Sequence, residues 1–299
     1  MSLLNTMIYT SLRLFMLCSL ICLLLPTNLV ADENLFGYVY GAETLPKGKW
    51  EAYQWLTSRV GKGKGRYLGL DAKTEIEYGI SDRFQLSLYF NNVYHNIRGA
   101  APKDEAGVPE YSDKNSFEFQ GNQVAFKYMV LSPYKDPFGL AFYFEPGYSR
   151  VDKITGEMVE EYELEYKVIL QKNFLDDSLI YAFNYTLEQE WERGAGESEF
   201  DGELIMEWAH GLSYRIFPKW YVGVENRWHT EFPNMDISNQ EHLGVFLGPT
   251  IHYGDKKWWA TLTVLPQIYG WPDDPERGEG LHLEEHEQME VRLKVGFNF

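Results

Sequence analysis

Residues 289–299 read MEVRLKVGFNF, and this stretch alternates between two kinds of side chain. One parity is wholly apolar, whereas the other carries Glu290, Arg292 and Lys294. Successive side chains of a β-strand point to opposite faces of the sheet, so the stretch predicts a strand with one apolar and one charged face. Such a strand suits a wall that separates lipid from a polar interior.

The same alternation recurs along most of the chain. Between residues 161 and 171, Tyr162 and Tyr166 share the apolar parity, whereas Glu163 and Lys167 share the other. The pattern predicts twelve strands, at residues 48–59, 67–79, 83–94, 117–131, 138–150, 158–172, 178–192, 200–215, 219–231, 241–253, 257–270 and 286–299. Most exceed the roughly 9–11 residues that cross a bilayer at a tilt. We therefore predict an all-β fold, an antiparallel transmembrane β-barrel of about twelve strands.

The connections between these strands alternate in length. Tight turns are expected at residues 79–82, 132–136, 173–177, 217–218 and 254–256, and longer polar segments at 95–116, 193–199, 232–240 and 271–285. Outer-membrane barrels combine short periplasmic turns with long outer loops, and usually have an even number of strands. A soluble β-sandwich is the alternative, but its strands are shorter and its loops are not sorted in this way.

Four residues conflict with a regular barrel wall. Pro146, Pro249 and Pro266 fall inside predicted strands, where proline cannot donate a ladder hydrogen bond, so we expect bulges there. His210 has the lipid-facing parity of its strand, where an imidazole is costly. We expect a bulge or a local change of register at this residue as well.

Residues 1–31 have the order of a secretory signal, namely Arg13, an apolar run to Leu25 and small residues before Asp32. The run is too short for a spanning helix, which needs about 20 residues. We predict a signal peptide at 1–31, cleaved near Ala31. A lipoprotein modified at Cys22 is the alternative, although the apolar run continues beyond that residue.

Residues 32–47 are predicted to be an N-terminal segment at the periplasmic mouth, followed by the barrel at 48–299. The segment contains Leu35, Phe36, Tyr38 and Tyr40, and it is therefore too apolar for a free tail.

The composition agrees with an exported barrel. Aromatic residues make up 16% of the 299 residues, and both cysteines precede residue 32, so the exported chain would have no disulfide. The net charge is −17, which argues against nucleic-acid binding because that function needs clustered Lys and Arg.

Three stretches resemble known outer-membrane barrels. Residues 74–88, TEIEYGISDRFQLSL, resemble a periplasmic hairpin, and the final Phe299 on an alternating strand resembles the signal read by the barrel-assembly machinery. Residues 43–51, ETLPKGKWE, resemble the start of the first strand in uncharacterised transporter barrels, including the phenol-degradation (MetA-pathway) type. The resemblance implies a Gram-negative outer-membrane location, contact with outer-membrane lipid and with the assembly machinery, and transport of a small solute.

The inward parity of the predicted strands is rich in ionisable residues. We predict that the lumen is lined by Asp71, Glu75, Glu77, Glu163, Glu165, Lys167, Glu188, Glu190, Glu207, Glu225, Arg227, Glu290, Arg292 and Lys294. Because acids outnumber bases, we expect a channel or transporter that favours cations or basic solutes. The alternative is a filled, non-conducting structural or adhesive barrel, since twelve strands lie between plugged and open sizes. If the lumen conducts, replacing Glu163 and Glu165 by Gln should lower its cation preference.

Enzyme chemistry has little support in the sequence. Residues 282–286, HLEEH, match an inverted zinc-protease motif, but they lie in a predicted loop instead of on the helix that this chemistry needs. We expect a solvated acidic loop, with a divalent cation held by His282, Glu284, Glu285 and His286 as the alternative. A lipid-modifying barrel enzyme would need an activated serine, and none of the seven histidines begins the His-x-Ser pattern of such families. We therefore predict no catalytic residues, no metal and no cofactor.

Overall fold

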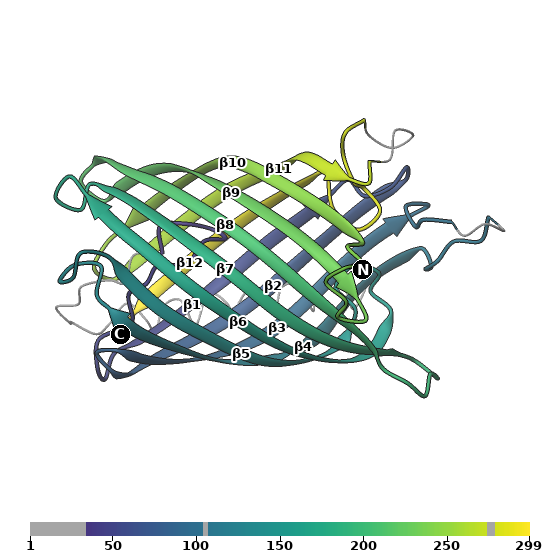
Figure 1. Ribbon diagram of the computed structural model, residues 1–299, viewed down its shortest axis with the longest axis horizontal. Coiled ribbons are helices and arrows are strands. Elements are labelled where there is room, and N and C mark those ends of the chain that lie inside the picture. The colour runs from purple at the N-terminus through teal and green to yellow at the C-terminus, as the bar shows by residue number, and fades with distance from the viewer. Residues whose placement is uncertain (1–33, 104–106, 274–278) are drawn as a thin grey trace, which may run out of the picture.

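The chain forms a closed barrel of twelve antiparallel strands (Figure 1). The structure, a computed structural model, describes residues 34–103, 107–273 and 279–299. The strands are β1 (Trp50–Val60), β2 (Arg66–Ser81), β3 (Phe84–Arg98), β4 (Lys114–Leu131), β5 (Gly139–Val151), β6 (Met158–Phe174), β7 (Leu179–Gly194), β8 (Asp201–Phe217), β9 (Trp220–Pro233), β10 (His242–Gly254), β11 (Trp258–Trp271) and β12 (Met289–Asn298). The predicted fold class is confirmed, and each predicted strand overlaps an observed one.

The barrel closes where β1 pairs with β12. This pairing runs from Glu51 opposite Asn298 to Val60 opposite Met289, and β1 pairs on its other side with β2. Every strand therefore has two hydrogen-bonded neighbours, and no sheet edge remains. Lipid offers no hydrogen bonds, so a spanning sheet must close in this way. None of the described residues belongs to a helix long and apolar enough to cross a membrane.

The outward face of the barrel is apolar, whereas the inward face is mostly polar. On β6, Tyr162 and Tyr166 point outward with 45% and 41% of their surface exposed, whereas Glu161 and Glu163 are buried inside. A continuous exposed apolar band of this kind is stable against lipid and would aggregate in water. The alternation predicted for this strand is therefore the alternation that the barrel uses.

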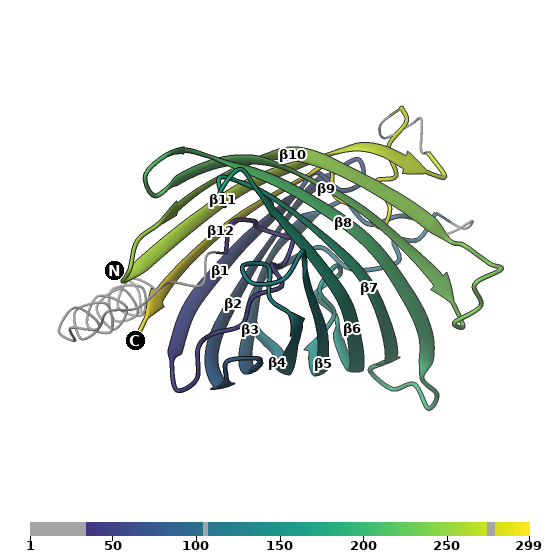
Figure 2. The ribbon, with the colours of Figure 1, turned by 60° about the vertical axis from the view of Figure 1, so that its left-hand side comes forward.

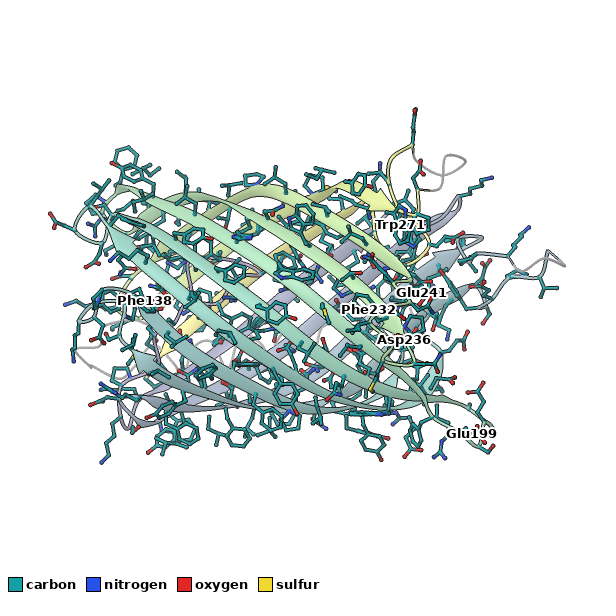
Figure 3. All side chains as sticks on the ribbon, viewed as in Figure 1. Phe138, Glu199, Phe232, Asp236, Glu241 and Trp271 are labelled. Atoms are coloured by element: carbon teal, nitrogen blue, oxygen red, sulfur yellow. The ribbon has the colours of Figure 1, made fainter. Side chains whose placement is uncertain are left out.

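Aromatic rings gather near both ends of the outward face. At one end the ring centroids of Trp50 and Tyr78 lie 4.5 Å apart, and towards the other those of Tyr148 and Tyr162 lie 5.4 Å apart. Figure 3 places Phe138 near the first end and Trp271 near the second. Two aromatic girdles of this kind mark the two membrane interfaces of an outer-membrane barrel.

The two ends of the barrel differ in their connections. At one end, here the turn end, the connections span residues 82–83, 132–138, 175–178, 218–219 and 255–257. At the other, here the loop end, they span residues 61–65, 99–113, 152–157, 195–200, 234–241 and 272–288. The start of β1 and the end of β12 lie at the turn end. Figure 3 places the acidic residues Glu199, Asp236 and Glu241 at the loop end.

Pro146 and Pro249 interrupt the ladder without shifting it, so the bulges predicted there are wrong, whereas an irregularity does lie close to Pro266. Pro146 pairs with Leu164 of β6, and on its β4 side the ladder resumes in the same register. Pro249 and Pro266 likewise pair on one side only. The register between β10 and β11 is unchanged across Pro249, but it shifts beside Pro266, where Val245 pairs with Tyr269 and Phe246 with Gln267, so that Ile268 is left over. A strand thus tolerates proline by losing ladder hydrogen bonds on one side.

His210 also lies in a regular part of the wall. It pairs in register with Phe183, and the expected irregularity is absent. Its Nδ1 lies 2.8 Å from the hydroxyl oxygen of Tyr181, which is on the same outward face. This hydrogen bond lowers the cost of placing an imidazole towards lipid.

We predict that Leu56→Arg lowers the free energy of unfolding by about 2–4 kcal/mol, the cost of an arginine facing lipid near the bilayer midplane. Leu56 lies on the outward face in the middle of β1 and is exposed. Denaturant titration of the protein refolded into vesicles, followed by tryptophan fluorescence, measures the change. Ile80→Arg is the matched control, because Ile80 faces outward at the turn end of β2, where we expect about 0–1 kcal/mol. Equal losses in the two variants would contradict this placement of the bilayer.

Candidate functional site, an acidic vestibule above a tyrosine floor

Residues 34–47 run through the interior of the barrel at its turn end. Figure 2 shows this dark purple stretch inside the ring of strands. Leu35 and Phe36 are buried there and pack in one cluster with Ile180 and Tyr221 of the wall. This stretch, here the plug segment, fills the turn end of the barrel. The predicted signal peptide, its cleavage site and residues 32–33 lie outside the described residues.

Side chains of the wall satisfy the backbone of the plug segment. Glu225 accepts hydrogen bonds from the N–H groups of Gly37, Tyr38 and Val39, at 2.8, 2.7 and 3.1 Å. Further bonds from wall amide side chains join Asn184 to Tyr40, Gln171 to Ala42 and Gln85 to Leu45. Buried backbone groups need partners, and here side chains supply them in place of a strand ladder.

Two tyrosines of the plug segment form a floor across the lumen. The Tyr40 ring lies 5.4 Å from that of Tyr143 on β5 and 6.2 Å from that of Trp55 on β1, measured between centroids. The guanidinium of Arg292 lies 3.8 Å over the centroid of the Tyr38 ring. Cation–π contacts of this kind hold aromatic rings in place in a charged interior. Beneath the floor, a cavity of about 20 Å³ lined partly by Tyr40 has room for about one water.

A larger cavity of about 640 Å³ lies above this floor, towards the loop end. We call it the vestibule. Its lining is mostly polar, and one side is a wall of carboxylates contributed by β6, β7 and β8. The β-sheet register sets like charges opposite one another, pairing Glu161 with Glu192, Glu163 with Glu190, and Glu165 with Glu188. Like charges in directly opposed positions repel, so this wall favours a neutralising cation.

Basic residues neutralise the other parts of the lining. Arg227 forms ion pairs with Glu207 and Glu290, at 2.5 and 2.7 Å. Arg59 likewise bonds Asp71 and Glu287, each at 2.9 Å. Lys167 pairs with Glu165, and Lys73 pairs with Glu145. The excess of carboxyl groups over basic groups is therefore concentrated on β7 and its neighbours.

Two groups of three carboxylates lie close together on the acidic wall. Glu161 belongs to both groups, once with Asp152 and Glu192 and once with Glu163 and Glu190. Within each group, one oxygen of every carboxylate lies within 4.8 Å of the others. Oxygen ligands at such spacing suit hard cations such as Ca²⁺.

The predicted lumen residues fall into two layers. Ten line the vestibule, namely Asp71, Glu163, Glu165, Lys167, Glu188, Glu190, Glu207, Arg227, Glu290 and Arg292. Glu75, Glu77, Glu225 and Lys294 lie lower, around the floor and the plug segment. Glu77 accepts a hydrogen bond from the Tyr53 hydroxyl, and the ammonium of Lys294 bonds Asn34. This lower layer therefore holds the plug segment and the aromatic floor in place.

Several vestibule residues were not predicted from the sequence. Arg59 was missed because apolar and polar residues alternate poorly in the first predicted strand, so its inward face could not be assigned. The ion pairs of Arg59 could not be anticipated either. His229, His242 and His286 all line the vestibule, yet His229 and His286 are far apart in the sequence and form no local motif. Glu161 and Glu192 share the inward parity of predicted lumen residues, and that signal could have identified them.

Residues 279–288, the described part of the loop that leads into β12, fold into the mouth of the vestibule, so the expectation of a solvated loop is wrong at its histidines. His282 and His286 are each only 5% exposed, and the backbone of His282 is bonded to the Gln267 side chain in both directions. Burial lowers the pKa of both imidazoles, which are therefore neutral at pH 7. The motif at 282–286 thus contributes to the vestibule wall.

The family and the fold have counterparts among known proteins. The sequence model described as "Family of unknown function (DUF6662)" matches residues 28–299. No curated protein matches the chain by sequence. The structure is similar to the COG4313 outer membrane channel from Pseudomonas putida F1, with a TM-score of 0.51 and 12% identity over 86% of this chain and 98% of that chain.

Two porin structures are also similar in outline. The NanC porin has a TM-score of 0.48 and 9% identity over 84% of this chain and 98% of its own. The KdgM porin, in a complex with disordered oligogalacturonate, has a TM-score of 0.45 and 12% identity over 84% and 99%. At such identities the likeness to solved structures concerns the fold alone.

We predict that Glu225→Ala releases the plug segment while the barrel wall stays folded. Three buried N–H groups would lose their acceptor, at about 1–3 kcal/mol for each unsatisfied group, whereas the Thr263 hydroxyl keeps Thr250 Oγ1 as an acceptor. Chymotrypsin should then cleave near Phe36, Tyr38 and Tyr40 in the folded protein, detected by mass spectrometry. Glu188→Ala is the control, because Glu188 faces the same lumen without a bond to the segment. Equal resistance of both variants to cleavage would argue against the role of Glu225.

Proposed function

The chain belongs to the DUF6662 family, whose function is unknown, and we propose that it is an outer-membrane channel for cations that its own N-terminal segment closes. The observation that carries this proposal is the vestibule. A cavity of about 640 Å³ has an excess of carboxylates on one wall and ends on a floor of two tyrosines. That floor belongs to a segment bound to the wall by side chains alone.

The orientation follows from the connections. Outer-membrane barrels place short turns in the periplasm and long loops outside the cell. The turn end, with the plug segment, then faces the periplasm, and the vestibule opens outward. Its partners would be outer-membrane lipid around the aromatic girdles and the barrel-assembly machinery at β12 during insertion.

The charge of the vestibule supports cations as the solute class. A narrow space lined by one sign of charge, between walls of low dielectric constant, concentrates counterions. Rings and walls of Asp and Glu select cations in channels. The acids of β7, Glu188, Glu190 and Glu192, form no ion pair within the described residues, so their carboxyl groups are available to a solute. Metal cations and small basic organic solutes both fit this surface.

The way in which the plug segment is held supports its role as a gate. Each hydrogen bond that holds it contributes about 0.5–1.5 kcal/mol net, since water replaces the bond when it breaks. The ladder of a strand, by contrast, has many such bonds on two sides. The segment can therefore leave its position without opening the wall.

The resemblance of residues 43–51 to transporter barrels of the MetA-pathway type agrees with transport, and the acidic lining favours basic or cationic solutes over neutral aromatic ones. A filled, non-conducting barrel is the second candidate function. The observation in its favour is the same floor, which closes the lumen in this structure. The experiments below separate the two functions.

We predict that Glu225→Ala combined with Asn184→Ala turns a mostly closed barrel into a conducting one. These two side chains hold the plug segment from Gly37 to Tyr40. Single-channel recording in planar bilayers should show rare, brief openings of the wild type and long-lived steps of the double variant. Heat-modifiable gel mobility checks that both are folded. A folded double variant whose segment is released, yet which never conducts, would support the structural barrel instead.

We predict that Glu188→Gln with Glu190→Gln lowers the cation preference of the open channel. A unit charge attracts another by about 1 kcal/mol at about 4 Å in water, so we expect the permeability ratio to fall by roughly fivefold. Reversal potentials under a KCl gradient measure this ratio in the plug-released background. Asp236→Asn, which removes a charge from an exposed loop tip, is the control and should leave the ratio unchanged. Unchanged selectivity in the Gln variant would remove β7 from the conduction path.

A further inference from the structure

We propose that the loop end of the barrel contains a binding site for a divalent transition-metal ion, built from the imidazoles of His242 and His286 together with His229 and His282. These are four of the seven histidines of the chain. His229 lies on β9, His242 begins β10, and the other two lie in the loop that leads into β12. The ring centroids of His242, His282 and His286 lie 4.7–5.8 Å apart, and that of His229 lies 5.2 Å from His286.

Two nitrogens already converge. His242 Nδ1 lies 3.0 Å from His286 Nε2, and both residues are at least 95% buried. Two imidazole nitrogens at about 2.0–2.1 Å from one tetrahedral Zn²⁺ are about 3.4 Å apart. A small separation of the two rings would therefore replace the hydrogen bond with two metal–nitrogen bonds.

Neighbouring groups orient the rings as they do in metal sites. His242 Nε2 lies 3.1 Å from Glu231 Oε2, so a proton on Nε2 leaves the lone pair of Nδ1 directed at His286. His282 Nδ1 lies 2.7 Å from the carbonyl oxygen of Pro272, and a proton there leaves the lone pair on Nε2. Ligating histidines commonly give their other N–H to a carboxylate or a carbonyl in this manner.

Two buried nitrogens of the cluster lack hydrogen bonds. His282 Nε2 and His229 Nδ1 are inaccessible to solvent and have no hydrogen-bond partner among the residues that the structure describes. His229 Nδ1 lies 3.7 Å from Glu231 Oε1, beyond hydrogen-bond distance. A buried polar atom without a partner is costly, and a metal ion between the rings would relieve that cost. The proposed site requires the His229 and His282 side chains to rotate so that these atoms reach the His242–His286 pair.

The wall provides space for the two loop histidines. A Cβ atom at Gly244 on β10 would come within 2.5 Å of the His286 ring, and one at Gly270 on β11 would come within 2.0 Å of the His282 backbone nitrogen. Glycine at both positions therefore lets the loop pack closely against the wall. The site would link this loop to β9 and β10 at the mouth of the vestibule.

The ligand type distinguishes this site from the carboxylate groups on the acidic wall of the vestibule. Imidazole suits Zn²⁺, Ni²⁺, Cu²⁺ and Co²⁺, whereas carboxylates suit Mg²⁺ and Ca²⁺. The proposal does not depend on conduction, because a closed barrel would have the same site.

Binding of Co²⁺ and Zn²⁺ to the full-length exported chain, refolded in detergent, tests the proposal. We expect one Co²⁺ with a visible absorption spectrum of nitrogen ligation, displaced by Zn²⁺ and retained in a hundredfold excess of Mg²⁺. His242→Ala with His286→Ala should abolish it, and Glu231→Gln should weaken Co²⁺ binding roughly 10- to 100-fold. Gly244→Ala, which displaces His286, should weaken it as well.

The matched controls are His210→Ala, which removes a lipid-facing histidine, and Glu161→Gln with Glu190→Gln, which removes the carboxylate groups. Both should retain the Co²⁺ spectrum. Because the histidine variant could misfold, the wild type supplies a second measurement, in which Zn²⁺ should slow the modification of His282 and His286 by diethylpyrocarbonate. A folded wild type with no such spectrum and no protection would overturn the proposal. Binding that survives the histidine variant but is lost in the carboxylate variant would overturn it too.

Discussion

The structure depends on one constraint, that every backbone N–H and C=O group within a membrane needs a partner inside the protein. The pairing of β1 with β12 satisfies it at the seam of the barrel. Closure then fixes the two faces, because alternate side chains must point to lipid or to the lumen. The outward tyrosines of β6 and its inward glutamates are consequences of the same register.

The plug segment meets this constraint in another way. It has no strand beside it, so Glu225, Asn184, Gln171 and Gln85 bond its backbone. Without the plug segment, the hydrogen-bonding groups of these buried side chains would need other partners. The carboxylates of β7 above the floor bond no part of the plug segment, and in the proposed channel their mutual repulsion would favour cations.

The fold was predictable because period-two alternation is a local signal, and strands such as 161–171 carry it strongly. The lumen faces of Glu163 and Glu190 followed from the same parity. Contacts across the barrel were not predictable, because Glu225 and Gly37 are far apart in the sequence and only closure brings them together. His282 and His286 were noted in the motif at 282–286, but their approach to His229 and His242 was missed for the same reason. His210 was misjudged because parity cannot show that Tyr181 supplies a hydrogen bond.

The short connection between the plug segment and β1 has a kinetic consequence. The segment ends at Lys47 and β1 begins at Trp50, so a displaced plug stays tethered at the mouth that it left. In the proposed gate its return would be intramolecular, governed by a high effective concentration, and independent of how many barrels the membrane contains. Openings would therefore end by first-order reclosure, and the mean open time would not depend on the concentration of the protein.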